Sequence, residues 1–455
     1  MKRAAAALAL VLAACGGSEA PAGGHAASAR PKVAILCADG ATFTVIDPLL
    51  KAGKLPHIAD LIARGARCVL QSADPPKASP VLWATIFTGA SKEKHGILAF
   101  TAVQPDGTTR IYSSADRKLP ALWNLVCARG GTAGVVGNLN TWPAEAVDGY
   151  IVTDRFARGD YGRDPAVRAV TTRVTWPEDL LDELRPLLPG PGAPSREDLA
   201  VLGTFSDAEW AALQHSNDAD AELRNGLLAL RYGWTTQQGN LAAALHLLQT
   251  RPQPDLLIVF LELTDRVGHH FWHAYRPEDV VGGPDAVPAE WRERWAHIVP
   301  GAYEVLDQAV GELMQRLGPD TTVFIVSDHG MQSSGGNGGD PAQPSAVGGS
   351  GKHHRDGVLI AAGPAIRREG YAVATIWDVA PTVLAALGLP GSEQFEGRVL
   401  STLLDPHFVA AHPQPAPLAD PATAPADTAP DNGLPAQYLE QLQAFGYVGG
   451  DGRDR

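Results

Sequence analysis

Three apolar runs in this sequence are each followed at once by residues whose side chains could bind a metal or a phosphate. They are Lys32–Ala38 with Asp39, Asp255–Thr264 with Asp265, and Thr321–Ser327 with Asp328 and His329. Such runs predict strands that are buried on both faces. Because ligands of open α/β sheets bind at the carboxyl ends of the strands, the three acids are expected on one edge of a sheet. Taken alone, Asp328-His329-Gly330 could equally be an ordinary turn.

Histidines accompany two of these acids. His269 and His270 follow Asp265 closely, and His353 and His354 precede another apolar run. Three carboxylates and at least three imidazoles would then share one rim, which is costly unless cations neutralise the acids. Mixed carboxylate and imidazole ligation suits Zn²⁺, with Mn²⁺ or Fe as alternatives, better than Ca²⁺ or Mg²⁺. Six ligands are enough for two metal ions.

A pair of metal ions can hold the attacking and leaving oxygens of an in-line displacement at phosphorus. The candidate nucleophile is Ser79, which precedes Pro80 at the start of an expected helix. The free N–H groups of a helix N-terminus favour a phosphate there. The alternative is that Ser79 only caps the helix, with Pro80 in its first turn. The residues alone leave both interpretations open.

The segments that must position these residues alternate between strand and helix. The expected strands are Lys32–Ala38, Thr132–Val136, Asp255–Leu263, Thr321–Val326 and Gly357–Ala362. The expected helices are Leu55–Gly65, Val81–Thr88, Leu241–Leu248 and Tyr303–Leu317. This alternation predicts an α/β fold with a mostly parallel sheet and helices on both faces. Residues from about 155 to 232 contain Pro-Gly clusters instead and predict an inserted cap.

The N-terminus indicates export. Lys2 and Arg3 precede a short apolar run, and Leu12–Cys15 resembles a bacterial lipobox. We therefore expect a lipoprotein signal peptide over residues 1–15, lipidation of Cys15 and a flexible tether over 16–31. A plain secretory signal is the alternative. The expected location is the periplasm, with a lipid anchor in the membrane, and Gly16 favours the outer membrane of a Gram-negative bacterium.

Composition and the remaining segments set further limits. With 455 residues, of which 45% are hydrophobic, the chain can bury a large core. Its net charge of −13 argues against a nucleic-acid-binding surface. Cys37 and Cys68 are expected to be buried in strands. We expect the catalytic domain to end near residue 404, followed by an Ala/Pro-rich linker over 405–435 and an amphipathic segment over 436–455.

Five motifs in order resemble the alkaline phosphatase superfamily, in its type I phosphodiesterase/nucleotide pyrophosphatase branch. They are Leu36–Gly40, Ser79–Ile97, Asp265–Trp272, Ser327–Met331 and Lys352–Pro364. The resemblance extends from about residue 32 to residue 404 and implies an alkaline-phosphatase-like fold, here in a bacterial lipoprotein. It also implies two metal sites, one formed by Asp39, Asp328, His329 and the Ser79 oxygen, the other by Asp265, His269 and His353. The spacing of residues in the family's motifs indicates His269 rather than His270, and His353 rather than His354, as the metal ligands.

The function that follows is a two-metal phosphoesterase acting on a small phosphate ester through a Ser79 phospho-enzyme intermediate. The resemblance favours phosphodiesters over monoesters. Phe100 lies near the place where nucleotide pyrophosphatases carry an asparagine that holds a phosphate oxygen. Residues that could supply a replacement donor are Lys77, Asn138, Asn140, Lys352 and Arg355.

Three other classes of function compete with this one. A phosphotransferase would use the same residues and differ only in the acceptor. A sulfatase needs a Cys or Ser followed by x-Pro-x-Arg, whereas Ser79 is followed by Pro-Val-Leu-Trp. A non-catalytic lipoprotein would be expected to lack some of the ligands, yet every position is filled.

Overall fold

The computed structural model describes residues 30–74, 78–105, 107, 109–157, 172–190, 192–214, 221–280, 282–334, 350–370 and 372–419, with the backbone alone for 221–225. The expected signal peptide, with Cys15, nearly all of the tether, and the segment from residue 420 onward lie outside this part of the chain. None of the helices described is long and apolar enough to cross a membrane.

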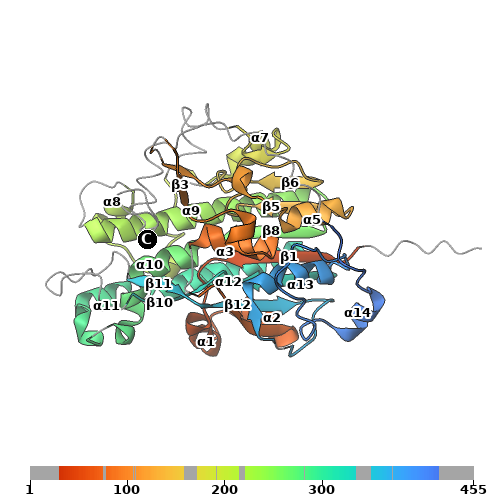
Figure 1. Cartoon of the computed structure of the whole chain (residues 1–455). Coiled ribbons are helices and arrows are strands. Elements are labelled where there is room, and N and C mark those ends of the chain that lie inside the picture. Colours follow the sequence, from red (N-terminus) through yellow and green to blue (C-terminus); the bar gives the residue numbers. More distant parts are fainter. Residues whose placement is uncertain are drawn as a thin grey trace, which may run out of the picture. The chain divides into compact units, whose positions relative to one another are not determined.

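A nine-stranded sheet forms the centre of the fold (Figure 1). In spatial order its strands are β13 (Ala374–Thr375), β2 (Ala66–Gln71), β12 (Asp356–Ala362), β9 (Thr321–Val326), β1 (Lys32–Ala38), β8 (Leu256–Leu261), β5 (Ala133–Val136), β6 (Gly149–Val152) and β7 (Thr175–Trp176). The strands from β9 through β6 run parallel to one another. β12 is antiparallel to both of its neighbours, and β7 is antiparallel to β6. The sheet is therefore mixed but mostly parallel, which confirms the predicted class.

Two small antiparallel pairs lie outside the main sheet. One joins β3 (Thr101–Val103) to β4 (Thr109–Ile111). The other joins β10 (Gly330–Ser333) to β11 (Gly351–His354). Because β10 follows β9 closely, the second pair brings the histidines of β11 back to the edge where β9 ends.

Helices cover the sheet and the regions between its strands. The described α-helices are α1 (Phe43–Lys51), α2 (Pro56–Arg64), α3 (Ser79–Thr88), α4 (Lys92–His95), α5 (Leu122–Ala128), α7 (Leu180–Leu184), α8 (Asp207–Gln214), α9 (Ala221–Thr250), α10 (Leu263–Tyr275), α11 (Ala289–Trp295), α12 (Ile298–Arg316), α13 (Val379–Ala386) and α14 (Pro406–Ala411). Short 3₁₀ helices are η1 (Ser114–Asp116), η3 (Arg185–Leu187), η4 (Ala200–Leu202), η5 (Pro277–Asp279), η6 (Pro284–Ala286) and η7 (Ile376–Asp378).

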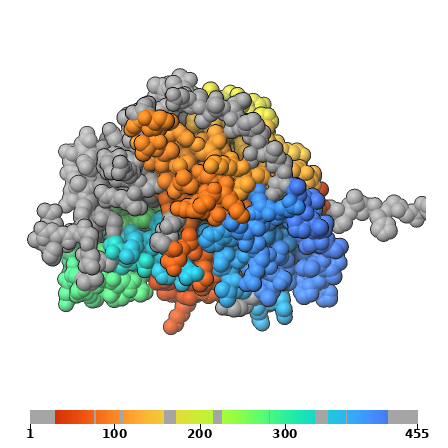
Figure 2. Space-filling model, in the orientation of Figure 1, coloured from red at the N-terminus to blue at the C-terminus, as the bar shows by residue number. Residues whose placement is uncertain are grey.

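The two faces of the sheet carry separate hydrophobic cores. Alternate residues of β1 point to opposite faces, so Leu36 packs among α1, α2, α9, α10 and α12, while Ile35 packs among α3, α5 and α13. Helices therefore cover both faces, as expected. Cys37 and Cys68 are buried within β1 and β2, as predicted. In the space-filling view the blue part of the chain lies against the orange segment that contains α3, in agreement with the contact between α13 and α3 (Figure 2).

The strand expected over Asp255–Thr264 ends earlier, at Leu261. Helix α10 begins at Leu263, so Asp265 lies in the first turn of a helix and not at a strand end. The reason is that Leu263, Val267 and Phe271 recur every four residues, and all three are buried in the core beside α9 and α12. The sequence prediction treated this helical spacing as a continuation of the strand.

The expected cap over 155–232 stays a prediction, because residues 158–171, 191 and 215–220 lie outside the described part of the chain. Helix α9 continues unbroken past position 232 to Thr250.

Candidate active site

Two adjacent strands bring the first group of acids and histidine together. Asp39 is the first residue after β1, and Asp328 and His329 follow β9, the neighbour of β1 in the sheet. One ligand atom from each of the three side chains lies within 4.8 Å of the others. All three residues are buried. This triad contains the residues that the resemblance assigns to one metal.

Hydrogen bonding defines which nitrogen of His329 faces the acids. Its Nδ1 lies 2.8 Å from the carbonyl oxygen of Gly330, and a carbonyl can only accept, so Nδ1 carries the hydrogen. Nε2 lies 3.5 Å from Asp39 Oδ1 and 3.6 Å from Asp328 Oδ2. In the neutral ring the Nε2 lone pair therefore points at the two carboxylates, which is the orientation of a metal ligand.

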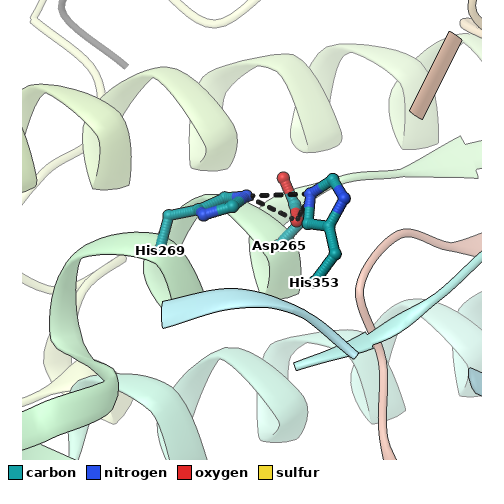
Figure 3. Close-up of side chains that lie close together, drawn as sticks. All are labelled: Asp265, His269 and His353. Carbon is teal, nitrogen blue, oxygen red and sulfur yellow. Dashed lines mark hydrogen bonds and ion pairs between the residues drawn. The ribbon is translucent and has the colours of Figure 1, made fainter. Parts of the chain in front are cut away.

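The second triad consists of Asp265, His269 and His353, again with ligand atoms within 4.8 Å of one another. Asp265 and His269 lie one turn apart on α10, and His353 comes from β11 (Figure 3). His269 Nδ1 donates to the carbonyl oxygen of Gly351 at 3.0 Å. Its Nε2 lies 3.3 Å from Asp265 Oδ1 and 3.2 Å from His353 Nε2. Two imidazole nitrogens so close can share one hydrogen, or both can bind a cation through their lone pairs.

The two triads are in contact. His329 Nε2 is 3.7 Å from Asp265 Oδ1, and the rings of His329 and His353 stack with centroids 3.5 Å apart and an angle of 20° between their planes. Gly40 permits this approach, because a Cβ there would lie 2.9 Å from the Cα of Asp265. Gly40 also has a φ of +68°, which favours glycine. Together the triads could hold two nearby cations.

Ser79 lies at the edge of the first triad. It is the first residue of α3, whose N-cap is Ala78, and the N-terminus of α3 has no side-chain cap. The Ser79 Oγ donates to Asp39 Oδ1 at 3.4 Å and lies 3.3 Å from His329 Nε2. The interpretation of Ser79 as a mere helix cap is therefore wrong. Its hydroxyl is directed at the acids, as a nucleophile in this site would be.

The helix end itself offers fewer donors than expected. Val81 and Leu82 both donate their N–H groups to the carbonyl oxygen of Ala78, and Pro80 has no N–H. Of the first four helical residues, only Ser79 has an N–H that these bonds do not use. A phosphate would thus be held mainly by cations and side chains.

The carboxylates of the two triads have strongly perturbed pKa values without cations. Burial, reinforced by the charges of Asp328 and Asp265, raises the pKa of Asp39 well above its usual range. Burial likewise raises the pKa of Asp328 to about 8. For Asp265, burial is outweighed by His269, His329 and His353, which hold its pKa well below the ordinary value. Divalent cations would favour the ionised form of all three acids.

The structure also places the alternative histidines. His270 is buried on α10, outside both triads, and the Nδ1 of His354 accepts a hydrogen bond from the backbone N–H of Asp356 at 3.1 Å. His269 and His353, which the motif spacing preferred, are the histidines that face Asp265. The chain's own arrangement thus agrees with the expected ligand sets, whose role in metal binding stays a prediction.

The candidate phosphate donors are mostly engaged elsewhere. The side-chain N–H of Asn140 donates to the carbonyl oxygen of Pro80 at 2.9 Å, and that of Asn138 donates to the carbonyl oxygen of Leu139 at 3.1 Å. Arg355 donates to Gln71 Oε1 at 3.1 Å and pairs with Asp74. Lys352 is exposed, and Lys77 lies outside the described residues.

Phe100, at the place of the expected asparagine, packs in a small apolar cluster with Ala229 and Tyr232. Ala78, which directly precedes Ser79, packs against the same cluster. The cluster therefore lies against the residue that precedes Ser79, and the Phe100 side chain offers no hydrogen-bond donor.

Two partners of Asp39 were not predicted from the sequence. The indole Nε1–H of Trp83 donates to Asp39 Oδ2 at 3.3 Å, and the Thr264 hydroxyl donates to the Asp39 carbonyl oxygen at 2.6 Å. The signal for Trp83 was present, because it follows Ser79 by four residues and hence shares its helix face. No comparable signal identifies Thr264.

The donor set fits two transition-metal ions. Each triad combines carboxylate oxygen with imidazole nitrogen, and in His269 and His329 a backbone carbonyl fixes the tautomer that leaves Nε2 directed at the acids. The buried carboxyl groups of Asp39 and Asp328, whose pKa values are raised, would otherwise lack a compensating charge. The residues therefore fit a pair of divalent cations, whose identity the geometry leaves open.

Comparison with known proteins gives the family. The family model for type I phosphodiesterase/nucleotide pyrophosphatase matches residues 33–375, about three quarters of the chain. No curated protein matches the sequence. Solved structures resemble the fold only distantly, and sulfatases are among them.

Three of these structures show the extent of the likeness. A phosphonoacetate hydrolase from Sinorhizobium meliloti has 16% identity and a TM-score of 0.37, over 67% of this chain and 57% of that protein. Human ectonucleotide pyrophosphatase/phosphodiesterase 5 has 15% identity and a TM-score of 0.44, over 82% of this chain and 100% of that chain. A variant of the alkaline phosphatase PafA has 13% identity and a TM-score of 0.49, over 83% of this chain and 99% of that chain.

The matched residues include all six members of the two triads and Ser79. The chain therefore belongs to the type I phosphodiesterase/nucleotide pyrophosphatase family of phosphoric ester hydrolases.

Proposed function

We propose that this chain is a two-metal phosphoesterase that acts through a phosphoseryl intermediate on Ser79 and prefers diesters to monoesters. One observation carries the proposal. The Ser79 Oγ lies 3.4 Å from Asp39 Oδ1 and 3.3 Å from His329 Nε2, in contact with a triad that adjoins a second triad. A nucleophile beside two cation sites is the arrangement needed for in-line transfer of a phosphoryl group. The preference for diesters rests on the family alone.

The residues would act as follows. Asp39, Asp328 and His329 would hold one cation, and Asp265, His269 and His353 the other. Two divalent cations bound there would lower the pKa of the Ser79 hydroxyl and neutralise charge on the phosphoryl group, with Zn²⁺ expected and Mn²⁺ or Fe as alternatives.

Ser79 Oγ, having lost its proton to solvent, then forms a bond to phosphorus. The bond from phosphorus to the ester oxygen breaks, and that oxygen leaves with its electron pair and takes up a proton. Water subsequently attacks the phosphoseryl group from the opposite side, which restores Ser79 and releases the phosphorylated product. Burial of Asp39, Asp328 and His329, and of Asp265 in the second triad, excludes bulk water from these charges, which strengthens their interactions.

A phosphotransferase remains the second candidate, because it would use the same residues with an alcohol in place of water. The sulfatase alternative is disfavoured by the segment after Ser79, in which Pro80 comes one position too early and no arginine follows. An anchored location in the periplasm through Cys15 is part of the proposal and rests on the sequence of the first fifteen residues.

The experiment is a metal analysis of the purified protein combined with rates on nitrophenyl phosphate monoesters and diesters. We expect about two transition-metal ions per chain, faster cleavage of the diester, and a rate reduced by at least about 10³-fold in Ser79→Ala. Product release that requires an added alcohol would support the transferase. Fewer than one bound metal ion per chain, or an undiminished rate in Ser79→Ala, would refute the proposal.

A further inference from the structure

The two side-chain oxygens of Asp39 face different neighbours. Oδ1 accepts from the Ser79 hydroxyl at 3.4 Å and lies 3.5 Å from His329 Nε2. Oδ2 accepts from the indole Nε1–H of Trp83 at 3.3 Å. One oxygen is thus directed at the reactive side of the site, and the other is occupied by a donor from the core.

The indole is held firmly in this position. Trp83 is fully buried, packs edge-on against Phe260 of β8 with centroids 5.5 Å apart, and stacks on Phe87 at 5.9 Å. A buried indole N–H usually has a hydrogen-bond partner, and Asp39 is the partner here. Because Trp83 follows Ser79 by one helical turn, the same rigid helix α3 fixes both the nucleophile and the donor to Asp39.

We propose that Trp83 is a positioning residue that makes Asp39 a ligand through Oδ1 alone. This inference rests on the proposed two-metal function and extends it. A donor on Oδ2 restrains rotation of the carboxylate and competes with a cation for that oxygen, which favours coordination through Oδ1. The cation held by Asp39, Asp328 and His329 consequently meets a fixed set of donors next to Ser79. Loss of such a supporting hydrogen bond typically weakens metal binding by about 10–100-fold.

The chain offers a matched control in Trp123 of α5. Its ring is also buried, it also packs against Phe87, with centroids 5.7 Å apart, and its Nε1–H also donates to a carboxylate, Glu145 Oε2, at 3.0 Å. Glu145 belongs to neither triad. Replacing either tryptophan by phenylalanine removes one indole N–H and a similar volume from the same core. Only Trp83→Phe removes a donor to an expected ligand.

The test is a titration of Zn²⁺ into chelator-treated protein in the presence of a competing indicator. Wild type is expected to bind two ions. Trp83→Phe is expected to bind one of them at least about tenfold more weakly and the other unchanged. Trp123→Phe is expected to match wild type. A second readout is the ¹⁵N–¹H resonance of the Trp83 indole in wild type, identified by its absence in Trp83→Phe, which is expected to shift when the ions bind.

The outcomes are distinguishable. If wild type binds two ions and Trp83→Phe binds both with unchanged affinity, the role of Trp83 is refuted while the two-metal function stands. Equal weakening in Trp83→Phe and Trp123→Phe would refute it too, because the effect would then come from core packing. If Trp83→Phe does not fold, the lack of a Zn²⁺-dependent shift in every indole resonance of wild type refutes the role. Failure of wild type to bind any ion refutes the two-metal function, and the role of Trp83 with it.

Discussion

Without bound cations, the folded protein should become less stable as the pH rises, because of Asp328. Burial raises the pKa of this residue from 3.8 to about 8. Between these values the folded protein keeps a proton on Asp328 that the unfolded chain has released. Raising the pH therefore favours unfolding, and the stability that the buried neutral acid provides at low pH is lost as the pH passes through the folded pKa.

The magnitude follows from the size of the pKa shift. Each pKa unit corresponds to about 1.4 kcal/mol, so the full window from pH 3.8 to about 8 amounts to roughly 6 kcal/mol. Burial lowers the pKa of His95 to about 4, which has the opposite effect on stability between about pH 4 and 6.5. The clearer window is pH 6.5 to 8, above the range of His95, in which Asp328 should lower the free energy of unfolding by about 2 kcal/mol. Asp39, whose pKa burial also raises, changes the stability in the same direction, so the contribution of Asp328 is obtained by comparison with a variant that lacks it.

The assay is urea unfolding of chelator-treated protein at several pH values, followed by tryptophan fluorescence. Asp328→Asn is the matched control, since the amide has the same shape and does not titrate. Wild type without cations should lose about 2 kcal/mol relative to Asp328→Asn between pH 6.5 and 8. Added Zn²⁺ should abolish this loss in wild type, because the ion binds the ionised acid and stabilises the folded state by mass action. A difference between the two proteins that stays constant or grows in favour of wild type would refute the reasoning.

Two further predictions concern the second triad and helix α3. His269→Ala should reduce the bound transition metal from about two ions per chain to about one, as measured by elemental analysis. His270→Ala is the control and should retain both ions. Equal metal loss in the two variants would contradict the assignment of His269. Gly89→Ala should lower the free energy of unfolding by roughly 1–3 kcal/mol in a urea titration, because Gly89 has a φ of +63° and a Cβ there would lie 2.5 Å from Phe395. Gly53 also has a positive φ, of +71°, but a Cβ there would meet nothing within 4 Å. Gly53→Ala should therefore lower the free energy of unfolding by less than Gly89→Ala. A larger loss in Gly53→Ala would be inconsistent with the contact to Phe395.

The sequence predicted the strands of the sheet best where they are buried on both faces. β1 and β9 have the expected starts, and all residues of β9 are buried, so a continuous apolar run describes them well. The sequence prediction is wrong at the end of β8, because the apolar run continues into α10. There the spacing of the buried apolar residues changes from two, as in a strand, to nearly four, as in a helix. Asp265 was therefore placed at the correct rim for an incorrect reason.

The candidate site could be predicted from the sequence only in part. The acids after β1 and β9 follow from strand ends, and His269 follows from its four-residue spacing from Asp265. The position of His353 depends on the pairing of β10 with β11, which no local pattern specifies. The hydrogen bond from Trp83 to Asp39 depends on how α3 is rotated against the sheet, which is set by packing between segments distant in sequence.

The distance along the chain between the partners in the site has a consequence for folding. Ser79 and His329 are separated by 250 positions, and His269 and His353 by 84. Contacts of such long range form late, since much of the loop entropy must be lost first. The first triad cannot form before β1 and β9 have paired, and the second cannot form before the β10–β11 hairpin has docked beside α10. Cations can then speed folding little, and should act mainly by slowing the unfolding of the finished protein.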